Sequence, residues 1–245
     1  MNPVPVSVCM ATRNGERFLP RQLESILRQL AKDDEIIVSD DSSTDRTPEI
    51  VASCRDPRVK FFPGNAFFHP AYNLENALKR STGEIIVLAD QDDVWLENKV
   101  DLVRERLKGR SGQIVTLSLD GEVIDAEGVV VCASIFGMIG AGRGLVKNLY
   151  DNTYMGCTMA FTRRLLDVAL PFPKTIPMHD SWLGLLSEIY GEVEFVPEKT
   201  MQYRRHEDNA SFRRPFREQV GSRLALAGNL LRRRLLVGTL PCNRN

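Results

Sequence analysis

The sequence predicts an α/β fold with a mostly parallel central sheet flanked by helices. Short apolar runs typical of buried strands alternate with segments whose apolar residues recur every three or four positions, as in amphipathic helices. Such alternation is typical of βαβ units, in which the strands run parallel. Three apolar runs end in polar residues, at 12–14, 40–42 and 90–93. Because ligands bind beyond the carboxyl ends of parallel strands, we expect these residues to form one site.

The first half of the chain contains a regular succession of strands and helices. A helix is expected from about residue 17, where Leu19, Leu23 and Ile26 mark one apolar face. Another is expected from about residue 45, with Ser43 or Thr44 as its cap. The predicted strands of this half are 4–11, 35–39, 59–62 and 84–89, and further helices are predicted around 74–78 and 98–108.

The pattern of the sequence changes after residue 114. Asp120-Gly121 is a turn signal, and four glycines within 137–144 favour a mobile loop. A helix is predicted at 181–189, preceded by a proline-containing loop. Short strands are predicted at 114–119, 123–124, 129–131 and 158–161, and 200–205 is predicted to be extended.

The polar cluster at 90–93 contains three carboxylates directly after an apolar run that is too short to cross a membrane. Buried unpaired charge is costly, so these side chains must be solvated, paired or bound to a cation. Clustered oxygen ligands suit Mg²⁺ or Mn²⁺, which usually bridge to phosphates. We therefore expect a divalent-metal site for a diphosphate. The alternative is a polar loop whose acids only cap the helix near residue 98.

Composition argues against several classes of protein. The 245 residues suffice for one sizeable α/β domain or two small ones, and 32 basic and 32 acidic residues give no net charge, so nucleic-acid binding is not expected. Five scattered cysteines without C-x-x-C spacing argue against a disulfide framework and a structural zinc, and we expect Cys9 and Cys157 in the core. No signal peptide and no membrane-spanning run is recognised, which favours the cytoplasm.

Residues 212–245 form a basic tail. Between 204 and 245 there are ten arginines and three acidic residues, and leucines are interspersed among the arginines. This pattern predicts an amphipathic helix that can lie on an anionic membrane surface. We expect this peripheral membrane contact. The alternative is a helix packed on the domain with its arginines in water.

Five motifs, in order along the chain, resemble the inverting glycosyltransferase family 2, in particular its bacterial rhamnosyltransferase-like branch. The resemblance covers roughly 4–210 and departs from the family pattern at Ser42, where Gly is common, and at Arg13, where Tyr or Phe is frequent. The motifs are the opening strand at 6–15, Asp40-Asp41-Ser42-Ser43-Thr44-Asp45, Asp90-Gln91-Asp92-Asp93, Met178-His179-Asp180-Ser181-Trp182, and Tyr203-Arg204-Arg205-His206 with Asn209.

The resemblance implies the GT-A fold, whose central sheet is Rossmann-like. It also implies a glycosyltransferase domain over 1–211, with a nucleotide-binding half at about 1–110 and an acceptor-binding half at about 111–211. The basic tail, 212–245, follows this domain. The implied donor is a dTDP- or UDP-linked sugar, with dTDP-rhamnose suggested by the branch. The implied acceptor is a glycan or lipid-linked oligosaccharide of bacterial surface polysaccharide synthesis, such as O-antigen or capsule.

The resemblance also implies roles for residues of the metal and catalytic motifs. Sugar transfer needs a base for the acceptor hydroxyl and cationic stabilisation of the departing diphosphate. Asp180 is the implied base. Asp92 and Asp93 are the implied residues of the metal side, where Mg²⁺ or Mn²⁺ would bind, with Asp93 expected as the direct ligand and Asp92 also near the ribose. His206 is a further candidate, either as a metal ligand or as a hydrogen-bond donor to the diphosphate, while Asp90 and Arg204 are expected to orient the motif or meet the diphosphate.

A pyrimidine pocket is implied at the ends of the first two strands. Asp41 resembles the residue that accepts a hydrogen bond from the ring N–H of uracil or thymine, and Thr12 and Asn14 are expected to line the same pocket. The alternative is that Asp40 and Asp41 only begin a turn.

Three other functions were weighed against transfer. A dinucleotide-dependent dehydrogenase fails because the glycines at 140–144 have the wrong spacing and do not follow the first strand. A nucleotidyltransferase would usually carry a glycine-rich, basic phosphate loop after its first strand. A catalytically degenerate sugar-nucleotide-binding protein remains a further alternative, against which the intact Asp92, Asp93 and Asp180 argue.

Overall fold

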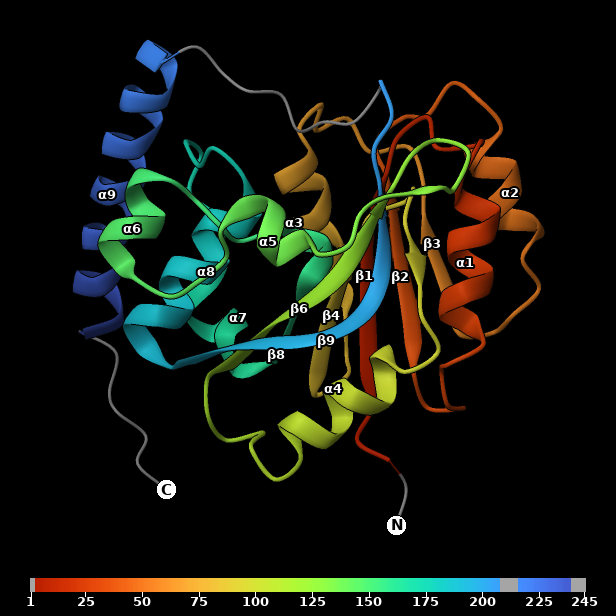
Figure 1. The fold of residues 1–245 in the computed structure, drawn as a ribbon, viewed down its shortest axis with the longest axis horizontal. Coiled ribbons are helices and arrows are strands. Elements are labelled where there is room, and N and C mark those ends of the chain that lie inside the picture. Colours follow the sequence, from red (N-terminus) through yellow and green to blue (C-terminus); the bar gives the residue numbers. More distant parts are fainter. Residues whose placement is uncertain (1–2, 208–215, 239–245) are drawn as a thin grey trace.

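The computed structural model describes residues 3–207 and 216–238. A twisted sheet of nine strands occupies the centre of this part of the chain, and helices cover it on both sides (Figure 1). The order in the sheet is β3 (Val59–Phe62), β2 (Glu35–Asp40), β1 (Val6–Thr12), β4 (Ile85–Ala89), β8 (Met159–Thr162), β6 (Val115–Ile124), β9 (Glu192–Arg204) and β5 (Val94–Trp95), and β7 (Val130–Cys132) pairs with β6.

The strands of the first half form the predicted parallel arrangement. β3, β2, β1 and β4 are neighbours and all run parallel. Thr12 pairs with Asp40 and Met10 with Ala89, so the polar residues that follow these strands meet at one edge of the sheet. The second half departs from this pattern, because β8 is antiparallel to both β4 and β6. The predicted α/β class is confirmed, whereas the sheet, predicted to be mostly parallel, is mixed, with four parallel and four antiparallel strand pairings among the described residues.

The helices form where the sequence supplies an apolar face. In α1, Leu19, Leu23 and Ile26 are all buried against the sheet. Consecutive residues of β1 point to opposite faces, so Val8 and Met10 belong to one core cluster and Cys9 to the other. The helices are α1 (Leu19–Leu27), α2 (Thr47–Ser53), α3 (Pro70–Arg80), α4 (Lys99–Leu107), α5 (Ile135–Ile139), α6 (Leu145–Tyr150), α7 (Arg164–Ala169), α8 (His179–Tyr190) and α9 (Phe216–Gly238), with a 3₁₀ turn at Gly156–Thr158.

The turn predicted at Asp120-Gly121 is wrong, because β6 continues through it to Ile124. The two residues instead mark a shift in the register between β6 and β9. The Asp120 carboxylate accepts hydrogen bonds from Gly121 N and Phe136 N, which satisfies it inside the sheet. A Cβ on Gly121 would lie 2.5 Å from Met201 O, so glycine permits the close approach of β9 rather than a turn.

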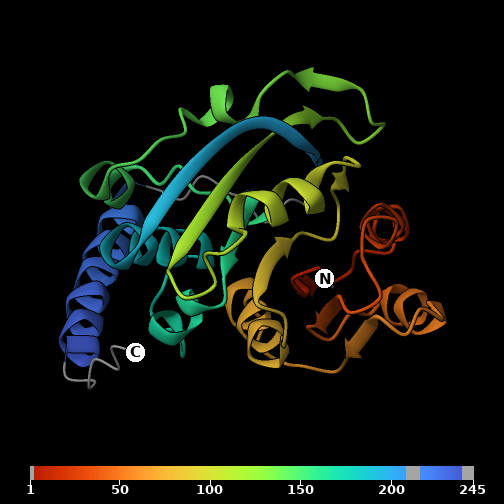
Figure 2. The same ribbon diagram turned by 90° about the horizontal axis from the view of Figure 1, so that it is seen from below.

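β9 is much longer than the predicted extended segment at 200–205. It spans 13 residues, Glu192–Arg204, and pairs with β6 along its length before pairing with β5 through Val94 and Trp95. Figure 2 shows it curving across the molecule beside β6. Through β5 and β9, the predicted nucleotide-binding half and acceptor-binding half share one sheet.

Several smaller predictions also needed correction. Neither Ser43 nor Thr44 caps α2, which begins at Thr47 after Arg46, and Ser43 binds the Asp40 carboxylate instead. The glycine-rich segment at 137–144 is partly helical, since α5 runs to Ile139 and is followed by Gly140, its C-cap, in the left-handed region (φ 62°). α6 and α7 were not predicted at all, because each spans only six residues.

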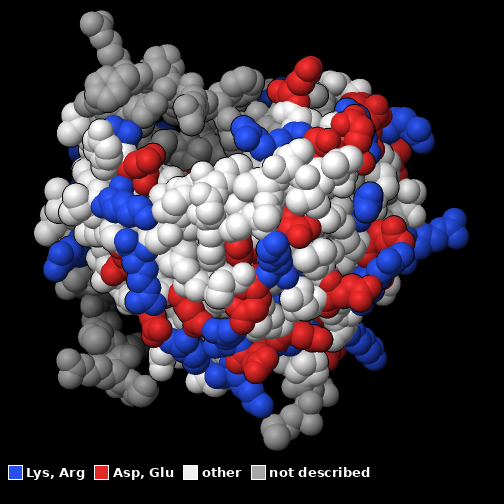
Figure 3. All heavy atoms as spheres, viewed as in Figure 1, with Lys and Arg blue, Asp and Glu red and all other residues white. Residues whose placement is uncertain are grey.

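The described part of the tail is the helix α9, which lies along one side of the molecule (Figure 1). Residues 212–215 and 239–245 of the predicted tail lie outside the described residues. Within the described ranges, no helix combines the length and apolar character that a bilayer crossing requires. Figure 3 shows basic and acidic side chains intermixed over one face of the molecule, in keeping with the zero net charge.

Candidate active site at the carboxyl edge of the sheet

A cavity of about 330 Å³ opens at the carboxyl edge of the parallel strands. Its walls come from the ends of β1, β2 and β4, from the 3₁₀ turn near residue 156, and from the start of α8. Segments far apart in the sequence therefore meet at one place. The predicted site residues among its lining are Thr12, Asp41, Asp90, Asp92 and Asp180.

Asp92 pairs with the histidine that follows β9. The distance from its Oδ2 to His206 Nε2 is 2.9 Å, and the His206 ring lies 4.9 Å from the Phe18 ring, measured between centroids. Asp92 lines the cavity, whereas His206 reaches the carboxylate from the end of the sheet. A carboxylate and an imidazole held together by separate segments resemble two ligands of one cation.

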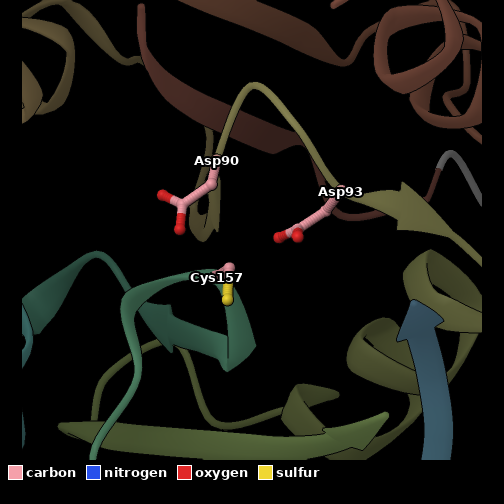
Figure 4. A group of neighbouring side chains, drawn as sticks. All are labelled: Asp90, Asp93 and Cys157. Atoms are coloured by element: carbon pink, nitrogen blue, oxygen red, sulfur yellow. The ribbon is translucent and has the colours of Figure 1, made fainter. Parts of the chain in front are cut away.

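Asp93 points in a different direction from Asp92. It is 1 % exposed, and its Oδ1 accepts a hydrogen bond from Arg204 N at 3.0 Å. Its Oδ2 has no hydrogen-bond partner among the described residues. Figure 4 shows this carboxylate directed toward Asp90 and Cys157, and ligand atoms of the three residues lie within 4.8 Å of one another.

The acidic cluster carries strongly perturbed pKa values. Burial raises the pKa of Asp90 to about 7, with a further contribution from the negative charge of Asp92. The pKa of Asp93 is raised well above its ordinary range, again by burial first and by Asp92 second. These carboxyls resist simultaneous ionisation, so the site favours a cation or protons near them.

Lys99 is a site residue that the sequence reasoning missed. Its side chain is completely buried below the acidic cluster, with Nζ donating a hydrogen bond to Cys157 O at 2.9 Å and lying 4.4 Å from the Trp95 ring centroid. Burial lowers its pKa to about 8. The sequence did contain a sign of this burial. Lys99, Val103 and Leu107 are spaced by four residues, so Lys99 lies in the same row of α4 as two apolar residues.

Asp41 anchors a loop at the cavity wall. It is 2 % exposed, and its two carboxylate oxygens accept hydrogen bonds from Phe67 N at 2.7 Å and His69 N at 3.2 Å. Asp40 has a separate role, because it accepts hydrogen bonds from Thr12 Oγ1 and from Ser43. Thus Asp40 holds the turn after β2, while Asp41 faces the cavity.

Asn14 does not line the cavity. It adopts a left-handed conformation (φ 49°), and its side-chain oxygen accepts a hydrogen bond from Thr44 N at 2.8 Å. This hydrogen bond therefore joins the loop after β1 to the loop after β2. Thr12, in contrast, does line the cavity.

Asp180 lies in the first turn of α8 and lines the cavity. Its Oδ1 accepts a hydrogen bond from Ser181 N at 2.5 Å, and burial raises its pKa to about 6. At neutral pH this carboxyl is ionised, yet it is a stronger base than an exposed aspartate. Asp180 and Asp90 line the same cavity, and the negative charge of Asp180 contributes to the raised pKa of Asp90.

His179 lines the cavity next to Asp180 but has a different character. Burial lowers its pKa to about 4, so the ring is neutral at pH 7. Its Nδ1 has no hydrogen-bond partner among the described residues. A Cβ on Gly156 would lie 2.3 Å from His179 Nε2, so glycine at this position leaves space for the ring.

Arg204 holds the loops around the acidic motif. Its Nε donates to Asp92 O at 3.0 Å, and one terminal nitrogen donates to Asp125 O and Ala126 O. The guanidinium lies 4.7 Å from the Phe18 ring centroid, and the residue is 3 % exposed. It is not among the residues that line the cavity, and these contacts join the acidic motif to the segment at 125–126.

Comparison with known proteins identifies the family. Residues 7–164 match glycosyl transferase family 2. A beta-1,3-glucosyltransferase of Escherichia coli, WfgD, named for UDP-Glc and an alpha-D-GlcNAc-diphosphoundecaprenol acceptor, is 29 % identical over 77 % of this chain and 72 % of its own. A GalNAc(5)-diNAcBac-PP-undecaprenol beta-1,3-glucosyltransferase of Campylobacter jejuni is 34 % identical over 41 % of this chain and 34 % of its own. The chain thus spans most of the first relative but only about a third of the second.

Solved structures share the fold at low sequence identity. S. aureus TarS 1–349 in complex with UDP-GlcNAc matches with a TM-score of 0.69 and 20 % identity over 92 % of this chain and 67 % of that one. The mannosyltransferase PcManGT from Pyrobaculum calidifontis, in complex with GDP-Man and Mn²⁺, matches with a TM-score of 0.62 and 19 % identity over 94 % of this chain and 65 % of that one. The fold is GT-A. With residues 7–164 matching its family profile, this chain belongs to glycosyl transferase family 2.

Proposed function

We propose that the protein transfers a sugar, with inversion, from a UDP-sugar to a hydroxyl of a lipid-linked acceptor. The observation that carries the proposal is the single cavity lined by both Asp92, which pairs with His206, and Asp180. In this cavity the acidic motif would hold a diphosphate with its cation, and Asp180 would supply a base. The family membership supports transfer over nucleotide binding alone.

Asp180 performs the proton transfer in this proposal. Its carboxylate takes the proton of the acceptor hydroxyl as the hydroxyl oxygen attacks the anomeric carbon and the bond to the diphosphate breaks. A pKa of about 6 leaves the group ionised at neutral pH. The hydrogen bond from Ser181 N fixes one oxygen, so the carboxylate is oriented before the acceptor arrives.

Asp92 and His206 are the residues that we propose for Mg²⁺ or Mn²⁺. Their carboxylate and imidazole groups suit such an ion, and the unpartnered Oδ2 of Asp93 shows that the acidic cluster of the described chain has unused acceptor capacity. When bound, the ion would neutralise the charge of the departing diphosphate. Asp93 and Arg204 hold the motif in place through their mutual hydrogen bond.

The nucleotide is proposed to lie against Thr12 and Asp41. Both residues line the cavity, and the Asp41 carboxylate is already oriented by two backbone N–H groups. A carboxylate oxygen retains a second lone pair, which can accept the ring N–H of uracil. Asn14 would act indirectly, by fixing the neighbouring loops.

UDP-glucose is the donor that we propose to test first. The family resemblance suggested dTDP-rhamnose, but the relatives WfgD and WfaP of Escherichia coli are both named as glucosyltransferases that use UDP-Glc. Their names also specify diphosphoundecaprenol-linked acceptors, which supports a lipid-linked acceptor here. Such a substrate would place the enzyme at the cytoplasmic face of the membrane, in surface polysaccharide synthesis.

The decisive experiment is a transfer assay with purified protein, Mn²⁺ and a panel of UDP-glucose, UDP-GlcNAc and dTDP-rhamnose. The acceptor is a GlcNAc-diphospho-lipid analogue, and products are identified by mass and anomeric configuration. Formation of a β-linked glucoside with release of UDP supports the proposal. Tight UDP binding with neither transfer nor donor hydrolysis would support the degenerate binding protein instead, and formation of a nucleotide–sugar bond would indicate a nucleotidyltransferase.

A further inference from the structure

The helix α9 is docked on the domain through one of its faces. Leu226 and Leu230 are buried in the core cluster that also contains Trp182 of α8. Asn229 donates a hydrogen bond to Thr175, and Arg233 donates to the carbonyl oxygens of Leu170 and Pro171. The orientation of the helix is therefore fixed by specific contacts, which also determine the face that it turns outward.

The outward face of α9 is a row of leucines. Leu224, Leu231 and Leu235 are spaced by seven and four residues, which places them on one side of a helix. Their exposed fractions are 70 %, 66 % and 73 %. Gly228 lies between them with nothing near its Cβ position, so no other described part of the chain covers this row.

The neighbouring helix α6 exposes further apolar side chains. It packs beside α9, and the Arg223 guanidinium lies 4.5 Å from the Tyr150 ring centroid. Val146 and Tyr150, one helical turn apart on α6, are exposed by 80 % and 66 %. We call the five side chains the outer apolar face, which consists of Val146, Tyr150, Leu224, Leu231 and Leu235.

Basic side chains border the outer apolar face. Arg232 and Arg234 both belong to α9. Because each residue of an α-helix is turned by about 100° from the one before it, these two arginines lie on either side of the leucine row. The sequence of α9 contains five arginines and a single acidic residue, Glu218. On the left side of Figure 3, where α9 and α6 lie, basic side chains lie among uncharged surface and a smaller number of acidic side chains.

We propose that the outer apolar face binds the surface of an anionic lipid bilayer, with its leucines among the acyl chains and its arginines at the headgroups. The charge decides between possible occupants. A second copy would bring another arginine-rich helix against this one, whereas anionic headgroups complement the arginines. α9 would then lie in the plane of the interface while its inner face stays attached to the domain.

The test is sedimentation of the purified full chain with vesicles of phosphatidylcholine alone or mixed with phosphatidylglycerol. No sugar donor or acceptor is present, so the result is independent of the proposed reaction. We expect binding to the mixed vesicles and much weaker binding to phosphatidylcholine. Arg232→Gln with Arg234→Gln should lower the partition coefficient for mixed vesicles by about fivefold per arginine, and added salt should have the same direction of effect.

The combined variant Leu224→Gln, Leu231→Gln and Leu235→Gln should lose binding by roughly tenfold or more. The matched control is Val129→Gln with Val131→Gln, because these residues are 62 % and 58 % exposed but lie on the β6–β7 hairpin. The melting temperature should be unchanged in the leucine variant and in the valine control, since the side chains replaced in both variants are exposed.

Two results would overturn the proposal. The first is a failure of the vesicle assay, either as equal sedimentation of the leucine variant and the wild type or as no sedimentation of the wild type with mixed vesicles. The second is a wild-type dimer in light scattering that the leucine variant converts to monomer, which would assign the outer apolar face to a second copy of this chain.

Discussion

At the level of single residues, adjacent acids in the metal motif have different surroundings. Asp92 lines the cavity and pairs with His206, while Asp93 is buried and accepts a hydrogen bond from Arg204 N. The residues of the motif predicted an acidic cluster. They could not show which acid pairs with His206 and which with Arg204, because these contacts depend on where β9 places the residues at its end. The expectation that Asp93 is the direct ligand stays a prediction, and Asp92 with His206 is the alternative that we propose.

Asp93→Asn and Asp92→Asn should therefore separate the two roles. The amide introduced by Asp93→Asn retains an oxygen for the hydrogen bond from Arg204 N, so we expect Mn²⁺ activation of transfer to change less than about threefold. The Asp92→Asn variant loses the charge that faces His206, and we expect the Mn²⁺ concentration for half-activation to rise by roughly tenfold or more. Titration of activity with Mn²⁺ measures both. The reverse order of effects would restore Asp93 as the ligand.

Asp180→Asn tests the base. Removing the proton acceptor should lower kcat by about 10²–10⁴-fold, because general-base catalysis contributes on that order. The affinity for UDP, measured by calorimetry, should stay the same, since Asp180 is assigned to the acceptor side. His179→Gln is the neighbouring control, and we expect it to retain most of kcat. Wild-type turnover by the Asp180→Asn variant would contradict the assignment.

The pH dependence follows from the raised pKa of Asp180, about 6. A base must be unprotonated to act, so kcat should increase with pH up to about 6 and level off above it. His179, with a pKa lowered to about 4, stays neutral over this range, so it adds no second rise or fall to the dependence of kcat on pH. Initial rates at saturating donor and acceptor measure the profile. The residual activity of the Asp180→Asn variant should not show this increase with pH.

At the level of elements, the first four strands were predictable because each is a short apolar run between polar loops. The full length of β9 was not predictable, because Pro197 interrupts its sequence and because it contains three charged residues, Glu192, Glu194 and Glu198. The sheet accommodates Pro197 and Glu198 where the register shifts from Leu119–Val196 to Asp120–Lys199. A bulge that depends on a partner strand cannot be read from one strand alone.

Two helix glycines make a matched test of the packing of α8. A Cβ on Gly184 would lie 2.2 Å from the Tyr154 ring, whereas Gly228 of α9 has no atom within 4 Å of that position. Gly184→Ala should lower the free energy of unfolding by about 1–3 kcal/mol through overpacking. Gly228→Ala should raise it by about 0.5–1 kcal/mol, because alanine favours the helix. Denaturant unfolding measures both, and equal effects would refute the packing argument.

At the level of the whole molecule, the sequence predicted the parallel half of the sheet and the edge where the site lies. Residues from Thr12 to Asp180, contributed by both halves of the chain, line the same cavity. The spacing of Lys99, Val103 and Leu107 places Lys99 on the buried row of α4. Its contact with Cys157 O and the position of Arg204 could not be predicted, because both depend on how β9 and the 3₁₀ turn enclose the acidic cluster. Long-range contacts of this kind leave no periodic signal in the chain.

The late position of β9 has a consequence for biosynthesis. When the ribosome has delivered the chain as far as β8, the four parallel strands are complete, but Asp92 has no His206 and Asp180 has not been made. With the roles that we propose for His206 and Asp180, a nascent chain of this length would lack the means to turn over a donor. The proposed site becomes complete only when the 13 residues of β9 join β6 and β5 and bring His206 to Asp92.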